Sequence, residues 1–136
     1  MAHQLVIPVR WSDLDALNHV NNLAFLDFIQ EARIQAFDAM GVRLEGVREG
    51  PVVVNVNCNY RREIRYPTTV RVDTRLEVAS SRKLLMHHRI VNNDDPEILY
   101  ADACITVVWV NYAEGGATRL PAAVIDQTDT PGDAGS

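Results

Sequence analysis

The longest hydrophobic pattern in the chain is helical and covers residues 23–40. Apolar side chains recur at spacings of three and four, which puts them on one wide face of a helix. They are Leu23, Phe25, Leu26, Phe28, Ile29, Ala32, Ala36, Phe37 and Met40. Because few polar residues remain for the opposite side, we expect this helix to be largely enclosed. Asn21 or Asn22 can cap its start, and Gly41 is a natural stop.

After this helix the pattern changes to the alternation of apolar and polar residues that is typical of half-buried strands. It predicts strands at residues 52–60, 70–78, 83–91 and 97–110, and a first strand precedes the helix at residues 3–11. Consecutive strands without an intervening helix imply hairpins and antiparallel pairing. We therefore predict an α+β fold in which a curved, antiparallel, five-stranded sheet wraps around one long central helix.

Residues 52–60 carry two contrasting faces. Strict alternation predicts that one face holds Val52, Val54, Val56, Cys58 and Tyr60. The opposite face holds three amides, Asn55, Asn57 and Asn59. Three amides in a row would each need a partner in a core, so they suit a subunit interface or a wet cleft.

The bulk properties limit the class of protein. The 136 residues fit one domain, which we expect at 1–128, followed by a disordered tail at 129–136. The hydrophobic share of 47% is enough for a core, and a net charge of −5 without a basic block argues against nucleic-acid binding. We expect no signal peptide and no membrane span. Cys58 and Cys104 lie in strand-like runs, which favours buried free thiols and a cytoplasmic protein.

The polar turn before the helix holds the candidate chemistry. Asp13, Asp15 and His19 lie close together in the chain, just before the positive end of the helix. A helix N-terminus can polarise a carbonyl, and a carboxylate beside it can activate water or attack the carbonyl itself. Such residues are also common turn formers and caps. Local chemistry alone favours the structural role, most clearly for Asp13 and then for His19.

The same segment resembles the signature of the 4-hydroxybenzoyl-CoA thioesterase family of hot-dog-fold proteins, in which a D-x-D-x-x-G-H-V-N-N-type turn enters a helix containing E-A-R. Here residues 13–22 read DLDALNHVNN, and Glu31-Ala32-Arg33 follows. The segment is also similar to plant acyl-carrier-protein thioesterases. The motif covers about the first quarter of the chain, and the order of one strand, a long helix and four strands matches the hot-dog fold over the rest.

The resemblance implies a thioesterase with three catalytic residues. Asp15 corresponds to the family's catalytic carboxylate, which acts as nucleophile or general base. The backbone amide of Asn22 corresponds to the group that polarises the thioester carbonyl, and His19 orients or assists. Two positions depart from the related families: Asn18 replaces a glycine, although Asn tolerates positive φ, and Leu17 replaces an asparagine of the plant enzymes.

The implied substrate is an acyl-CoA or acyl-carrier-protein thioester, with no metal and no cofactor. Its phosphates need a basic patch, for which we expect Arg82 and Lys83 at a turn between strands; Arg61 and Arg62 with Arg65 form another patch. The family also implies a homodimer, or a tetramer of two dimers. Two alternatives remain open. One is a hot-dog hydratase or dehydratase, which the absence of its D-x-N-P-x-H pattern disfavours. The other is a non-catalytic acyl-thioester-binding domain.

Overall fold

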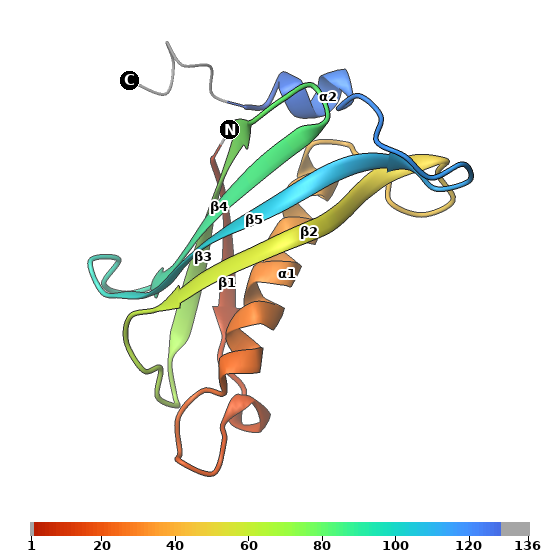
Figure 1. Ribbon diagram of the computed structural model, residues 1–136. Coiled ribbons are helices and arrows are strands. Elements are labelled where there is room, and N and C mark those ends of the chain that lie inside the picture. The colour runs from red at the N-terminus through yellow and green to blue at the C-terminus, as the bar shows by residue number, and fades with distance from the viewer. Residues whose placement is uncertain (1, 129–136) are drawn as a thin grey trace.

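The computed structural model describes residues 2–128, so the tail expected at 129–136 lies outside the described part of the chain (Figure 1). The elements in order are β1 (Ala2–Pro8), a 3-10 helix (Trp11–Asp13), α1 (Asn22–Ala39), β2 (Glu49–Tyr60), β3 (Thr69–Val78), β4 (Lys83–Asn92), β5 (Leu99–Asn111) and α2 (Ala122–Ile125). The predicted long helix and five strands are confirmed, whereas the 3-10 helix and α2 were not predicted.

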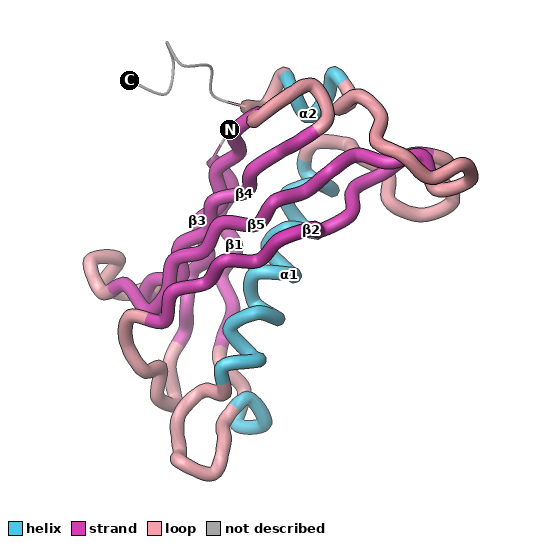
Figure 2. Tube along the Cα trace, in the orientation of Figure 1, coloured by secondary structure: helices cyan, strands magenta, loops and turns pink. Residues whose placement is uncertain are grey.

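The five strands form one antiparallel sheet with the order β1-β3-β4-β5-β2. Of the hairpins expected between the four consecutive strands, those joining β3 to β4 and β4 to β5 are present. The expected pairing of β2 with β3 is wrong, because β2 pairs with β5 instead. In contrast, β1 and β2 form the two edges, although only α1 and its flanking loops separate them in sequence. Figure 2 shows α1 crossing one face of the twisted sheet, which leaves the other face open. The predicted α+β architecture is therefore confirmed.

The core lies between α1 and the inner face of the sheet. Phe25, Phe28, Ile29 and Phe37 are buried on the helix, and the Phe37 ring meets Trp109 of β5 edge-on, with ring centroids 5.7 Å apart. The helix is less enclosed than its composition indicated, because one sheet covers only one side of it. Leu23 is consequently 68% exposed. Within residues 2–128, no helix is long and apolar enough to cross a membrane.

A β-bulge in β2 corrects the predicted alternation. The pairing of β2 with β5 shifts between Val53 and Asn55, because an extra residue is accommodated there. Val53 therefore pairs with buried Val107 and faces the helix, and Val52 lies on the outer face instead. Beyond the bulge the alternation holds, and Val56, Cys58 and Tyr60 share the inner face, opposite the three asparagines.

Both cysteines are free, as predicted, but each is only half-buried. Cys58 lies on edge strand β2. Cys104 lies on the outer side of β5, where it pairs with Asn57 of β2. The expectation of full burial was wrong because the edge strand lacks a neighbour and the outer face lacks a second layer.

Candidate active site

The turn from Arg10 to Asn21 is built around the side chain of Asp13. This buried carboxylate accepts hydrogen bonds from the backbone N–H of Arg10 (2.8 Å) and from its guanidinium Nη2 (2.8 Å). Burial alone would raise the pKa of Asp13, but the hydrogen bonds from Arg10 outweigh it and the pKa falls below its usual value. The carbonyl of Asp13 also accepts from Asn21 N. Asp13 therefore holds the turn, the role that local chemistry indicated.

Asp15 lies at the tip of the same turn, with a partly exposed carboxylate. Its Oδ1 accepts a hydrogen bond from Leu17 N at 2.8 Å, and its Oδ2 is 3.9 Å from Nδ1 of His19. The backbone of Asp15 donates to the carbonyl of His19, which closes the turn. Asn18 adopts a φ of 69°, the positive value that the asparagine in place of glycine was expected to tolerate. The turn thus fixes one free carboxylate oxygen beside an imidazole.

The start of α1 leaves one backbone amide unpaired. Asn21 is the cap: its Oδ1 accepts from Leu23 N at 2.8 Å, and its carbonyl accepts from Ala24 N at 2.9 Å. Among residues 2–128, no acceptor is found for the backbone N–H of Asn22. An unpaired N–H at the positive end of an 18-residue helix is a ready donor to an oxyanion.

A cavity of about 230 Å³ lies beside Asn22. It is lined by His19, Val20, Asn22, Phe25, Tyr60, Arg61, Arg62 and Glu63. Tyr60 closes one side: its ring stacks edge-on with Phe25 at 5.1 Å, and its hydroxyl donates to the carbonyl of Asn22 at 3.4 Å. The fold thus places His19 and Asn22 on this cavity, whereas Asp15 does not line it and contacts His19 instead.

Glu63 is a site residue that the sequence did not single out. Its Oε1 is 3.7 Å from Nε2 of His19, so the imidazole lies between the carboxylates of Asp15 and Glu63. A backbone hydrogen bond of 2.8 Å from Val20 N to the carbonyl of buried Ile64 holds the loop after β2 against the turn. This contact joins segments more than forty residues apart, so no local spacing signals it.

Arg82 and Lys83 lie far from this cavity within one chain. They occupy the β3–β4 turn, at the end of the sheet opposite the Asp15 turn (Figure 1). In the other basic patch, Arg61 and Arg62 both line the cavity, and Arg61 also pairs with Asp102 through Nε and Oδ2 at 2.7 Å.

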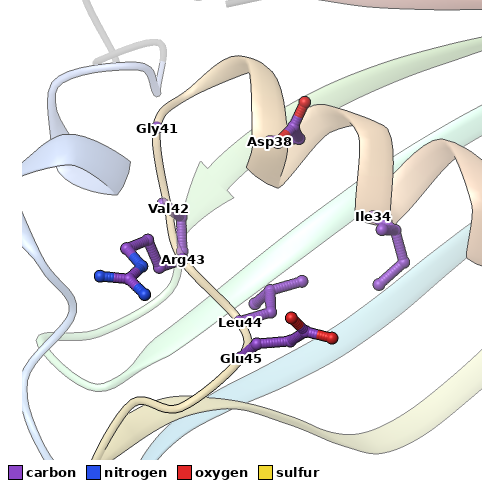
Figure 3. A pocket seen from close by; sticks show the side chains of 7 residues that line it. All are labelled: Ile34, Asp38, Gly41, Val42, Arg43, Leu44 and Glu45. Carbon is purple, nitrogen blue, oxygen red and sulfur yellow. The ribbon is translucent and has the colours of Figure 1, made fainter.

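A larger cavity, of about 380 Å³, lies at the other end of α1. Figure 3 shows its lining side chains, which come from the last turns of the helix and the following loop: Ile34, Asp38, Gly41, Val42, Arg43, Leu44 and Glu45. Size alone does not make it the reactive site. It offers neither a helix N-terminus nor an imidazole beside a carboxylate.

Two other kinds of chemistry find no support in the part of the chain that the structure describes. Burial raises the pKa of the Cys58 thiol, which disfavours the thiolate that a cysteine nucleophile needs. No group of three or more His, Cys, Asp or Glu residues is arranged to hold a metal ion between residues 2 and 128. Adjacent His87 and His88 point to opposite faces of β4, so they cannot bind one metal ion together; His87 contacts Glu77, and His88 is buried.

Comparison with known families and proteins assigns the fold and the class of activity. Residues 9–128 match the model of the thioesterase-like superfamily. The long-chain acyl-CoA thioesterase FadM of Escherichia coli is 29% identical over 119 residues, covering 86% of this chain and 89% of the relative.

Solved structures agree with this assignment. PA2801, a putative thioesterase from Pseudomonas aeruginosa, is 35% identical, with a TM-score of 0.87 and coverage of 91% of this chain and 95% of that one. Slr0204, a 1,4-dihydroxy-2-naphthoyl-CoA thioesterase from Synechocystis, has a TM-score of 0.86 over 96% of this chain and 100% of its own. At 17% identity, the second likeness shows the fold alone.

Proposed function

The chain belongs to the thioesterase-like superfamily, and we propose that it hydrolyses acyl-CoA thioesters, with Asp15 as the reacting carboxylate. It is a thioesterase of the hot-dog fold, and the coenzyme A ester is the substrate class of its relative FadM. The observation that carries the residue assignment is the unpaired N–H of Asn22. This donor opens into a cavity next to His19, whose imidazole contacts Asp15.

In the proposed mechanism the thioester carbonyl oxygen accepts a hydrogen bond from Asn22 N–H. Asp15 then either removes a proton from an attacking water or attacks the carbonyl carbon itself. The negative charge that develops on the oxygen is stabilised by the amide and the helix dipole. When Asp15 acts as a base, the carbon–sulfur bond breaks, the thiolate takes up the proton, and a carboxylic acid is released. When Asp15 attacks, loss of the thiolate leaves an acyl–Asp15 anhydride, which water then hydrolyses to release the carboxylic acid and restore the Asp15 carboxylate. The side chain of Leu17 has no polar group, so it cannot take the part of the asparagine found in the plant enzymes. Leu17 contributes only its backbone N–H, which donates to Asp15.

The primary test is an assay of thiol release from a panel of acyl-CoA esters, with acyl-carrier-protein thioesters and enoyl-CoA in parallel. We expect hydrolysis of acyl-CoA with appearance of free thiol. Hydration of enoyl-CoA without thiol release would identify a hydratase, and binding without turnover would identify a non-catalytic domain.

We propose that Glu63 positions the imidazole of His19. Replacing Glu63 with Gln removes the charge 3.7 Å from Nε2 but keeps the side-chain shape. Because the Glu63 carboxylate is 56% exposed, we expect kcat to fall by only about twofold to fivefold, with little change in KM. Glu63→Asp should restore part of the loss. The matched control is Glu97→Gln in the exposed β4–β5 turn, and equal rates for both Gln variants would refute the role of Glu63.

We propose a homodimer formed through β2, with a tetramer of two dimers as an extension. β2 is a twelve-residue edge strand without a neighbour on one side, and its only charged residue is Glu49. Val54 and Val56 are 55% and 50% exposed. A long apolar edge with unpaired N–H and C=O groups is prone to pair with another strand. A second β2 would satisfy both the backbone groups and the valines.

The dimer leads to a testable expectation for Val54. Val54→Lys places a charge in the paired edge, so we expect the dissociation constant of the dimer to rise by about a hundredfold or more. Sedimentation velocity at several protein concentrations measures this change. Val6→Lys is the matched control, because Val6 is 51% exposed on the opposite edge strand, β1. If Val54→Lys sediments like the parent protein, β2 is not the interface.

Two further assignments remain proposals. Arg82 and Lys83 are proposed to bind the phosphates of the substrate, and because they lie away from the Asp15 turn they would act on the site of a partner subunit. We also propose a cytoplasmic location, since the two free cysteines suit a reducing compartment.

A further inference from the structure

The seam between α1 and β2 continues beyond the cavity at the helix start. The inner-face residues of β2 run antiparallel to the helix, so Tyr60 lies beside Asn22 and Phe25 in the first cavity. A second cavity of about 260 Å³ follows along the same seam. Its lining comes from the next turns of the helix and the next residues of the strand: Leu26, Ile29, Gln30, Arg33, Val53, Val56 and Ile105.

The second cavity is mostly apolar, and its polar lining residues are Gln30 and Arg33. Leu26 and Ile29 on the helix face Val56 and Ile105 on the sheet, and Arg33 closes the end beside Val53. Asn22, Leu26, Ile29 and Arg33 follow the helical spacing of three and four, so they lie on one face of α1. A chain-like ligand that starts at the Asn22 amide and follows this face would meet the guanidinium of Arg33.

Arg33 is a half-buried cation without a counterion. Within residues 2–128 its side chain forms no hydrogen bond and no ion pair, and burial lowers its pKa. A guanidinium has five N–H donors, and leaving them unpaired in an apolar groove is unfavourable. A ligand with an anionic, oxygen-bearing end would supply both the charge and the acceptors.

His88 of β4, outside the lining of this cavity, also has an unpaired ring nitrogen. It is 1% exposed, its Nδ1 shares a hydrogen bond of 2.9 Å with Thr74 Oγ1, and its Nε2 has no partner. The charge of Arg33 is close enough to act on this imidazole.

We propose that the α1–β2 groove holds the acyl group of the substrate and that Arg33 selects acyl groups with a carboxylate at the end remote from the thioester. This inference rests on the proposed function, because the thioester carbonyl is placed at Asn22. From Asn22 to Arg33 the helix rises about 16 Å. Because a long helical side chain leans back toward the N-terminus, the acyl group has to span less than this rise to meet the guanidinium. The proposed dimer would add a second strand along β2 and so help to close the groove.

The test compares pairs of coenzyme A esters that differ only in the terminal carboxylate: hexanoyl with adipoyl, octanoyl with suberoyl, and dodecanoyl with dodecanedioyl. The parent enzyme should have the larger kcat/KM for the dicarboxylic ester in at least one pair. Arg33→Met keeps the length and apolar character of the side chain, and should lower that preference by about tenfold to a hundredfold, as expected for lost hydrogen bonds to a charged group. Arg33→Lys should retain part of the preference.

The controls separate substrate selection from folding and assembly. Arg75→Met removes an exposed arginine from β3 and should leave the preference unchanged. Thermal unfolding and sedimentation check that each variant is folded and has the parent's oligomeric state. If the parent enzyme hydrolyses the monocarboxylic esters equally well or better in every pair, or if Arg33→Met lowers both members of a pair equally, the proposal is wrong while the thioesterase function stands. Failure to hydrolyse any ester would instead refute the proposed function.

Discussion

Asp15→Asn is expected to lower kcat for acyl-CoA hydrolysis by about a hundredfold to ten-thousandfold. The variant keeps the size of the side chain and an oxygen that can accept from Leu17 N, so the turn should survive. It removes the negative charge that either activates water or attacks the carbonyl. Steady-state kinetics with the best ester of the panel measures the loss.

The control for Asp15→Asn is Asp38→Asn. Asp38 is exposed on the same helix that follows the turn, at the opposite end from the proposed site. Its replacement changes the net charge by the same amount and should leave turnover unchanged. Turnover of Asp15→Asn at the parental rate, with the protein folded, would show that another group performs the chemistry.

The two roles of Asp15 differ in the fate of solvent oxygen. If the carboxylate attacks, an acyl–enzyme anhydride forms, and its hydrolysis at the protein carbonyl leaves a solvent oxygen in Asp15. If the carboxylate acts as a general base, solvent oxygen enters only the released acid. The experiment is a single turnover in water labelled with the heavy oxygen isotope, followed by mass spectrometry of the peptide that contains Asp15. Heavy oxygen in this peptide indicates the nucleophilic route.

Acidification is expected to destabilise the fold through His88. Burial, followed by the positive charges of Arg33 and His87, lowers the pKa of His88 from 6.5 to about 3. The folded protein therefore favours the neutral imidazole. The stability due to this residue is fully present above pH 6.5, the unfolded value, and is lost as the pH falls toward 3.

The size of this effect follows from the shift. Each pKa unit corresponds to about 1.4 kcal/mol, so between pH 6.5 and pH 4.5 the parent protein should lose on the order of 3 kcal/mol relative to a variant without the imidazole. His88→Gln is that variant, since an amide can still bond to Thr74. Denaturant unfolding at matched protein concentration and several pH values provides the measurement. Equal losses in both proteins would mean that carboxylates such as Asp13 and Asp102 account for the acid sensitivity.

Much of the site was predictable because its signals are local. The helix start, the D-x-D turn and the positive φ of Asn18 all follow from residues within a few positions of one another. The structural role of Asp13 was also predictable in outline, since Arg10 engages its carboxylate. The catalytic role of Asp15 stays a prediction; one of its carboxylate oxygens accepts from Leu17 N, and the other is 3.9 Å from Nδ1 of His19.

By itself the sequence determined the elements, since hydrophobic period and turn residues act over a few positions. It therefore predicted α1, the five strands and the hairpins of β3, β4 and β5. Only the tertiary structure decided that β1 and β2 form opposite edges, that a bulge at Val54 moves Val53 to the inner face, and that Glu63 meets His19. These features depend on hydrogen bonds and packing between segments far apart in the chain, and no periodicity within one segment encodes which distant segment it will meet.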